Sequence, residues 1–218
     1  MKPIFTDVWV SFTSYDREAL KRLVCSIGAQ RVLEVGSWMG NGSTRALLEE
    51  GVTVFAVDHW LGNPNVGRHQ EIVAQFDVFR TFLNNTRQWA DHLKPMMMSS
   101  SEAASIVADE AFDLVFLDAD HSYDEALKDI VQWRPKVRPG GILCGHDCEG
   151  RPGDYHREEL MANRHLDAIS SQRFRHIHPG CILAVDEAFE GQAQLWAERP
   201  LELPGEDPGY STIWWVTC

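Results

Sequence analysis

The stretch Arg31–Gly42, with the sequence RVLEVGSWMGNG, decides the fold of this chain. Its first part, Arg31–Val35, consists mostly of aliphatic residues and predicts a buried strand. The rest is a turn whose glycines let the backbone adopt positive φ and pass close to a ligand. Glu34 stands inside the apolar strand, where an unpaired carboxylate is costly to bury. We therefore expect Glu34 to accept hydrogen bonds from a ligand or from nearby backbone.

The same alternation of short apolar runs and amphipathic segments continues along the chain and predicts repeated βα units around a mostly parallel sheet. Further strands are expected at Val52–Asp58, Pro95–Met98, Asp113–Leu117, Ile142–Gly145 and Ser211–Val216. Helices are expected at Asp16–Ile27, Ser43–Glu50, Arg68–Trp89, Ser101–Ala108, Tyr123–Val137 and Cys181–Glu190. We interpret residues 1–218 as one domain.

Residues 149–180 interrupt this pattern, because they contain few apolar positions and many His, Arg and Glu residues. From Tyr155 to His178 the basic residues are His156, Arg157, Arg164, His165, Arg173, Arg175, His176 and His178. Two interpretations stay open: a solvated surface segment, or a lid that recognises an anionic or polyhydroxylated substrate.

Composition excludes several classes of function. The 218 residues include 20 Lys and Arg against 32 Asp and Glu, a formal charge of −12. This charge argues against a general nucleic-acid binder and against binding to an anionic membrane. No run approaches the roughly 20 apolar residues of a membrane span, and we expect no secretory signal. The 5 cysteines favour a reducing cytosol over a disulfide framework. The oligomeric state stays open, with a homodimer as one possibility.

Polar or glycine-rich segments follow each predicted parallel strand, where ligands bind in open α/β sheets. These segments are Gly36–Gly42, Asp58–Trp60, Ser99–Glu102, Asp118–His121 and His146–Asp147. Turn formation explains the glycines, but it does not explain a row of acids that each follow an apolar run. Asp58 ends the second strand, where a carboxylate can accept both hydroxyls of a ribose.

Four segments together resemble the class I S-adenosylmethionine-dependent methyltransferases: LEVGSWMGNGSTRAL, VFAVDHW, FDLVFLDADHSYDEALKDIVQW and VRPGGILCGHD. The resemblance is to the methyltransferase domain 24 group, which is similar to macrocin and sugar O-methyltransferases and more distantly to catechol O-methyltransferase. It covers Arg31–Cys148, and HPGCILAVDEAF and STIWWV resemble the closing segments of that group. It implies a Rossmann-like, doubly wound, mostly parallel seven-stranded sheet with an antiparallel closing strand and helices on both faces.

The resemblance also implies which residues bind S-adenosyl-L-methionine. The methionine end would lie against Glu34, Gly36, Ser37 and Gly40, with Trp38 bordering the cofactor. Asp58 would hold the ribose, with His59 and Trp60 beside the adenine and Ser100, Ser101 and Glu102 at its edge. Asp118 and Ala119 would face the sulfonium and the substrate.

In the metal-dependent members, acids that end the fourth and fifth strands bind a divalent ion, Mg²⁺ or Mn²⁺. The matching residues here are Asp118, His146 and Asp147. His146 departs from the carboxylate of the family, and imidazole suits Mn, Fe, Ni or Zn better than Mg. The implied catalytic residues are Asp118, Asp120 and His121. Capping of the following helix is the alternative role for Asp120 and His121, whereas the catalytic role is that of a general base.

The sequence therefore predicts transfer of a methyl group from S-adenosylmethionine to a hydroxyl of a small molecule: a sugar, a polyol or a phenolic natural product. One alternative is a nicotinamide-dependent oxidoreductase, which the missing G-x-G-x-x-G spacing disfavours. Another is a non-catalytic S-adenosylmethionine-binding module, which the row of acids at the strand ends disfavours. The sequence does not identify the methyl acceptor.

Overall fold

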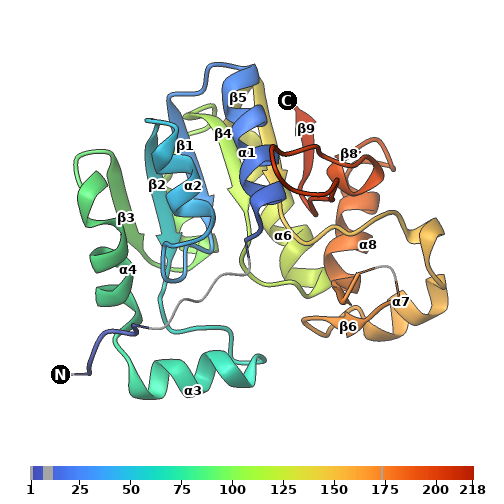
Figure 1. Cartoon of the computed structure of the whole chain (residues 1–218), viewed down its shortest axis with the longest axis horizontal. Coiled ribbons are helices and arrows are strands. Elements are labelled where there is room, and N and C mark those ends of the chain that lie inside the picture. The colour runs from blue at the N-terminus through green and yellow to red at the C-terminus, as the bar shows by residue number, and fades with distance from the viewer. Residues whose placement is uncertain (1, 7–11, 173) are drawn as a thin grey trace.

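The computed structural model describes residues 2–6, 12–172 and 174–218, so Arg173 of the expected lid lies outside the described residues. It contains a seven-stranded sheet of order β3-β2-β1-β4-β5-β9-β8 (Figure 1). The strands are β1 (Arg31–Val35), β2 (Thr53–Asp58), β3 (Leu93–Met97), β4 (Phe112–Leu117), β5 (Val137–Gly145), β8 (Gln194–Leu195) and β9 (Trp214–Thr217). Strands β1 to β5 are parallel, and β9 closes the sheet antiparallel to β5. The expected fold class is confirmed.

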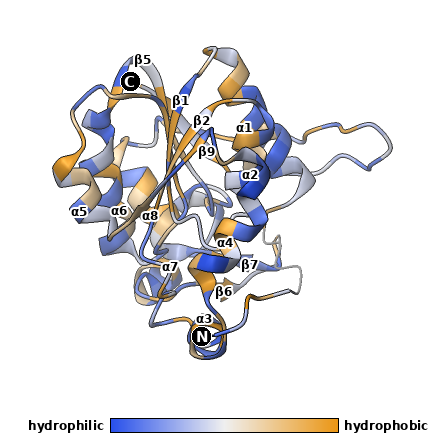
Figure 2. Ribbon diagram, turned by 90° about the vertical axis from the view of Figure 1, so that its left-hand side faces the viewer, coloured by the Kyte–Doolittle hydropathy of each residue, from blue (hydrophilic) through white to orange (hydrophobic). Residues whose placement is uncertain are grey.

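Helices cover both faces of the sheet, as Figure 2 shows with α1, α2 and α4 on one side and α5, α6 and α8 on the other. The α-helices are α1 (Ser14–Ser26), α2 (Ser43–Glu49), α3 (Gly67–Gln75), α4 (Val78–Thr86), α5 (Ser100–Ile106), α6 (Tyr123–Trp133), α7 (Arg157–Asn163) and α8 (Pro179–Ala188). Short 3₁₀ turns lie at Arg87–Trp89, Arg134–Lys136, Pro152–Asp154 and Trp196–Glu198.

Strand β1 shows why both faces are covered. Successive side chains of a strand point to opposite faces, and here Val32 packs into the core under α1 and α2 while Leu33 packs into the core under α6 and α8. Both side chains are fully buried. Burying one aliphatic side chain of this size stabilises a fold by about 1.5–3 kcal/mol. The aliphatic residues Val32, Leu33 and Val35 of the first strand are therefore what a two-sided sheet requires.

Two predicted helices were too long. The helix expected at Arg68–Trp89 is broken into α3 and α4, because the backbone is extended at Phe76 and Asp77 and the Asp77 side chain accepts the Arg80 N–H as the cap of α4. The helix expected at Tyr123–Val137 ends at Trp133. Pro135 then lies in a 3₁₀ turn, and Val137 already belongs to β5.

Other features also differ from expectation. The cap of α5 is Ser99, whose hydroxyl accepts the Glu102 N–H while the Glu102 carboxylate accepts the Ser99 N–H. Strand β8 was not predicted, because two residues are too few to show the alternation of apolar and polar side chains that is typical of a strand. The segment 149–180 is also more regular than expected, since it contains α7 and the hairpin β6 (Ile169–Ser170) and β7 (His176–Ile177).

Residues 149–180 are tied to the main fold by both packing and hydrogen bonds. Leu160 of α7 and Ile177 of β7 are buried in the core on the α8 side of the sheet. The Tyr123 N–H at the start of α6 donates to the Arg164 carbonyl at 2.8 Å. Across the described residues, no helix combines the length and the apolar character that crossing a membrane would need.

A close approach between α8 and the turn before α6 gives a test of this packing. A Cβ at Gly180 would lie 2.2 Å from the His121 carbonyl oxygen and 2.4 Å from the Tyr123 nitrogen. Both contacts are to backbone, which cannot move aside easily, so Gly180→Ala should lower the free energy of unfolding by about 1–3 kcal/mol or more. Urea denaturation measures this change. Gly67→Ala is the control, because nothing lies within 4 Å of a Cβ there; equal unfolding midpoints for both variants would contradict the packing.

Candidate active site

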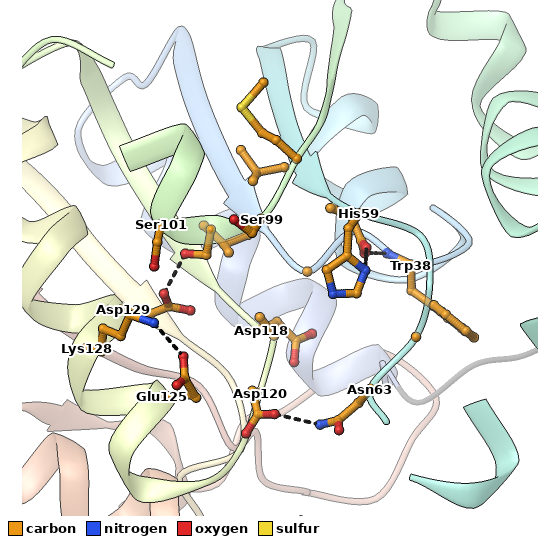
Figure 3. A pocket seen from close by; sticks show the side chains of 18 of the residues that line it. Trp38, His59, Asn63, Ser99, Ser101, Asp118, Asp120, Glu125, Lys128 and Asp129 are labelled. Carbon is orange, nitrogen blue, oxygen red and sulfur yellow. Dashed lines mark hydrogen bonds and ion pairs between the residues drawn. The ribbon is translucent and has the colours of Figure 1, made fainter. Parts of the chain in front are cut away.

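A cavity of about 460 Å³ opens at the carboxyl ends of β1, β2 and β4. This volume falls in the range of small-molecule and cofactor sites. Figure 3 shows Trp38 and His59 on one side of the cavity, Ser101 and Asp129 on the other, and Asp118 between them. We refer to it below as the main cavity.

The glycine turn after β1 forms one wall of the main cavity because glycine alone fits there. Gly36 has φ +92° and would place a Cβ 1.9 Å from the Asp118 carbonyl oxygen. The Gly36 N–H donates to the Val57 carbonyl, and the Asp118 N–H donates to the Val35 carbonyl. The end of β1 is thereby held between the ends of β2 and β4. Gly40 is similarly close-packed, with a Cβ position 2.8 Å from the Phe82 ring.

Glu34 lies fully buried behind this turn. The Thr44 hydroxyl donates to its Oε2 at 2.6 Å, and Ser37 is buried nearby. Within the described part of the chain, Glu34 Oε1 is buried without a hydrogen-bond partner. Burial raises the pKa of Glu34 to about 7, although hydroxyl hydrogen bonds oppose the shift. Glu34 thus accepts a hydrogen bond through one of its two oxygens, as expected, but the donor is the Thr44 side chain rather than nearby backbone.

Asp58 ends β2 and joins the two turns beside the main cavity. Its Oδ2 accepts the Trp38 N–H at 2.7 Å and its Oδ1 accepts the Trp60 N–H at 2.6 Å. Burial raises the pKa of Asp58, against the effect of these backbone hydrogen bonds. His59 lines the main cavity, whereas the Trp60 ring packs into the core against Phe79 and does not line it.

The start of α5 forms the opposite wall. Ser99, Ser100 and Ser101 line the main cavity, while Glu102 is exposed and turned toward the helix cap. Ser100 Oγ lies 2.5 Å from Asp129 Oδ1 and accepts the Trp133 indole N–H at 2.8 Å. Burial raises the pKa of Asp129 to about 6. Sequence reasoning missed Asp129, because an acid in the middle of an amphipathic helix resembles an ordinary surface residue.

Asp118, His121, His146 and Asp147 form an acid–histidine cluster at the ends of β4 and β5. His121 Nε2 lies 3.0 Å from Asp147 Oδ2 and 3.7 Å from Asp118 Oδ1. His146 Nδ1 lies 3.0 Å from Asp147 Oδ1 and 4.0 Å from Asp118 Oδ1. Asp147 has φ +60°, in the left-handed region. The structure thus brings together the residues predicted to bind metal and one of the predicted bases.

Further acids surround the acid–histidine cluster, none of which the sequence singled out. Asp16 Oδ2 of α1 lies 3.3 Å from His146 Nε2, and Asp167 Oδ1 lies 2.9 Å from His121 Nδ1. His178 Nδ1 lies 3.3 Å from Asp147 Oδ1 and 2.7 Å from Glu149 Oε1, and Glu149 is buried. No local sequence signal marks Asp16 or Asp167, because both come from segments distant in the chain, whereas Glu149 follows Asp147 by two residues.

The charges of the acid–histidine cluster set the protonation of its members. Burial disfavours a charged imidazole at His121 and at His146, but the surrounding carboxylates, with Asp147 foremost, raise the pKa of both well above the usual range. Burial likewise opposes ionisation of Asp147, but His146, His178 and His121 hold its pKa well below the usual range. The carboxylates around the imidazoles therefore stabilise positive charge at this point.

The donor atoms of the acid–histidine cluster fit a divalent cation. One ligand atom each from Asp118, His146 and Asp147 lies within 4.8 Å of the others. Two carboxylates and an imidazole form a mixed set of oxygen and nitrogen ligands. The carboxylates suit Mg²⁺ and Mn²⁺, and the imidazole favours a transition metal over Mg²⁺. His121 Nε2 is buried and has no well-aligned hydrogen-bond partner among the described residues, despite the nearby carboxylates. A cation held by the carboxylates, or a hydrogen-bonding group of a ligand, would give His121 Nε2 the partner that it lacks.

Asp120 differs from its neighbours because both of its oxygens are engaged. Its Oδ2 accepts a hydrogen bond from Asn63 Nδ2 at 2.9 Å, and its Oδ1 accepts the Ser122 N–H at 2.8 Å (Figure 3 shows the first of these). The second contact is a turn just before α6 and not a helix cap, because the N-cap of α6 is Ser122 and no side chain caps that helix. The first connects the loop before α3 to the rim of the main cavity.

The raised pKa of Glu34 predicts a pH-dependent stability. Because the folded-state pKa is about 7 against an ordinary 4.5, wild-type protein should lose stability as pH rises through this window, by up to about 3 kcal/mol. The side chain introduced by Glu34→Gln does not titrate. The free energy of unfolding of this variant, relative to that of wild type, should therefore increase between pH 4.5 and 8. Denaturation at several pH values measures the difference. The exposed Glu158→Gln is the control, and a pH-independent difference for Glu34→Gln would disprove the assignment.

Comparison with known proteins agrees with this geometry. Residues 33–148 match the family described as "Methyltransferase domain". An uncharacterized protein of Sinorhizobium fredii, y4gI, is 25% identical over 134 residues, which is 59% of this chain but only 14% of that protein.

Two solved structures share the fold. The O-methyltransferase from Bacillus cereus in complex with SAH has a TM-score of 0.56 and 17% identity, over 97% of this chain and 83% of its own. The 1,6-didemethyltoxoflavin-N1-methyltransferase from Burkholderia thailandensis, with bound 1,6-didemethyltoxoflavin and S-adenosylhomocysteine, has a TM-score of 0.50 and 14% identity, over 94% and 76% of the two chains.

Proposed function

This chain belongs to the methyltransferase domain family, and we propose that it transfers a methyl group from S-adenosylmethionine to a hydroxyl of a small molecule with the help of a divalent cation. One observation carries the proposal: the main cavity and the acid–histidine cluster share Asp118. S-adenosylmethionine in the main cavity would therefore present its sulfonium beside the acid–histidine cluster, where the acceptor hydroxyl would bind. A sugar, a polyol or a phenolic natural product is the proposed acceptor class.

The main cavity supports binding of the methyl donor. S-adenosylmethionine, when bound, supplies a methyl group on a positively charged sulfur. Gly36 would leave room for its methionine end, and Asp58, whose oxygens also accept the Trp38 and Trp60 N–H groups, would accept the ribose hydroxyls through its remaining lone pairs. Glu34 is fully buried behind the turn and is not among the residues that line the main cavity. Ser99–Ser101 line the wall at which the adenine would lie. Asp118 and Ala119 would face the sulfonium, where a carboxylate favours positive charge.

Asp118, His146 and Asp147 are the residues that would hold the cation. A divalent cation supplies Lewis acidity, which lowers the pKa of a bound hydroxyl and orients it. His121 Nε2 is the proposed proton acceptor, in the protein whose Asp118 and Asp147 hold a cation: positive charge there would offset the carboxylates that raise the pKa of this imidazole when no cation is bound. As the bond between the acceptor oxygen and the methyl carbon forms and the bond from that carbon to sulfur breaks, the hydroxyl proton moves to Nε2. We assign this role to His121 rather than Asp120, because His121 contacts Asp118 and Asp147, which would hold the cation, whereas Asp120 is hydrogen-bonded to Asn63 and to the Ser122 N–H.

Cofactor binding is the first test. S-adenosylmethionine and S-adenosylhomocysteine should bind in calorimetry, whereas NAD⁺ should not. Asp58→Ala should weaken binding by about 1.5–3 kcal/mol, the value of a charged hydrogen-bond acceptor. The exposed Asp91→Ala is the matched control. Since Asp58 also holds two backbone amides, the melting temperature of each variant is measured alongside. Unchanged affinity in a folded Asp58→Ala protein would refute the ribose assignment.

Metal dependence is the second test. Methyl transfer is followed as release of S-adenosylhomocysteine with a panel of sugars, polyols and catechols. A chelator should abolish it without displacing the cofactor, and Mn²⁺ or Mg²⁺ should restore it. Asp118→Asn and Asp147→Asn should each lower activity about 100-fold or more, while cofactor affinity changes far less. Full activity in excess chelator, with metal analysis finding no bound ion, would rule out the cation.

A further inference from the structure

Asp129 of α6 is a buried acid that lines the main cavity and takes no part in the acid–histidine cluster. Its exposed fraction is 7%. Figure 3 shows Asp129 between Ser101 and Glu125, with its carboxylate turned toward the cavity. Burying an ionised carboxylate is costly unless hydrogen bonds or opposite charge compensate for it. The hydrogen bonds of Asp129 therefore decide what this wall of the cavity can bind.

A chain of two hydrogen bonds determines which oxygen Asp129 presents to the main cavity. The Trp133 indole can only donate, so the Ser100 hydroxyl accepts its N–H, at 2.8 Å. The hydroxyl hydrogen of Ser100 then points to Asp129 Oδ1, which lies 2.5 Å from Ser100 Oγ. Among the described residues, none donates to Asp129 Oδ2, and this oxygen is not sealed inside the protein. Oδ2 is therefore the atom open to the cavity.

The charges around Asp129 leave this oxygen as a hydrogen-bond acceptor. Burial raises the pKa of Asp129 to about 6, with Glu125 and Asp120 adding to the shift and Ser100 and Lys128 opposing it. The neighbouring cation, Lys128, is paired with Glu125 at 3.0 Å, and both of these side chains are about half exposed. At pH 8 the Asp129 carboxyl is ionised, and an ionised carboxylate only accepts hydrogen bonds. The wall thus offers one acceptor that an N–H group of a ligand would satisfy.

The sheet places this wall next to the carboxylate that is proposed to hold the ribose. Asp58 of β2 is paired with Met97 of β3, and the Met98 N–H donates to the Asp58 carbonyl at 3.2 Å. Ser99–Ser101 follow directly in the chain. The base of a nucleoside whose ribose lies at Asp58 can therefore extend along this wall, where Met98 offers apolar surface to the ring. In an adenine ring attached to ribose, the amino group supplies the only N–H donors.

We propose that Asp129 Oδ2 accepts the amino group of the adenine ring and thereby selects an adenosyl cofactor over the corresponding inosyl compound. This inference rests on the proposed function, in particular on the ribose at Asp58. In an inosyl compound a carbonyl oxygen replaces the amino group, so that two acceptors would face each other across the contact. Ser100 and Trp133 are positioning residues, because they determine which oxygen of Asp129 is free.

Asp129→Asn is the decisive variant, because it keeps the size of the side chain and changes the hydrogen-bonding character of one atom. The hydroxyl hydrogen of Ser100 still needs an acceptor, so the amide oxygen should replace Oδ1 and the amide NH₂ should face the cavity. This donor opposes the amino group of adenine but matches the carbonyl oxygen of the inosyl ring. Asp124→Asn is the matched control, since Asp124 is an exposed acid of the same helix.

Calorimetry at pH 8 with S-adenosylhomocysteine and with S-inosylhomocysteine gives the ratio of the two affinities. In wild type and in Asp124→Asn, S-adenosylhomocysteine should bind about 10-fold more tightly or better, and in Asp129→Asn this preference should vanish or reverse. If Asp129 merely joined α5 to α6, its substitution would weaken both ligands alike. An unchanged ratio in Asp129→Asn would therefore overturn the inference. Equal affinities in wild type would overturn it without any variant.

5′-Methylthioadenosine distinguishes the two ends of the cofactor, because it keeps the adenine ring but lacks the amino-acid part with its ammonium group. Asp129→Asn should weaken this compound and S-adenosylhomocysteine by factors that agree within about 3-fold. A loss confined to S-adenosylhomocysteine would place Asp129 at the ammonium group instead and overturn the inference. If wild type binds none of the three compounds, the proposed function fails. Normal binding of S-adenosylhomocysteine with an unaltered ratio overturns only the role of Asp129.

Discussion

The approach of Gly36 to the end of β4 is the contact on which the rest of the site depends. With no side chain at this position, the turn after β1 can lie directly against the Asp118 backbone. Asp118 then becomes a common wall of the main cavity and the acid–histidine cluster. Any larger residue at position 36 would push the turn after β1 away from Asp118, since its Cβ would overlap the Asp118 carbonyl oxygen.

The acid–histidine cluster is organised around one carboxylate, Asp147. Its two oxygens lie within 3.3 Å of ring nitrogens of His121, His146 and His178. Each of these rings has a second carboxylate beside it, so imidazoles and acids alternate through the site. Buried charges of this kind are tolerated only when they are paired, and their pairing comes from five separate parts of the chain. The site therefore depends on the whole fold for its protonation state, and not only on the strand ends that carry it.

Much of the fold could be predicted, because it follows from local periodicity. Strand β1 has the expected bounds Arg31–Val35, and the acids that end β2 and β4 lie beside the main cavity as expected. The break between α3 and α4 was missed, because Asp77 stops one helix and caps the next within an unbroken amphipathic pattern. Asp129 and Asp167 were missed for a different reason: their roles arise from contacts across the fold, which leave no local pattern.

Asp16 connects the first helix to the site in a way that couples their energetics. It forms the capping box of α1 with Thr13, and the same carboxylate lies 3.3 Å from His146 Nε2. Its other oxygen accepts the Thr212 N–H, just before β9. Thermodynamic linkage then requires that whatever changes the charge on His146 also changes how tightly the first turn of α1 is held, and the reverse. Fraying of this end of α1 and a change in the charge of His146 are therefore energetically coupled.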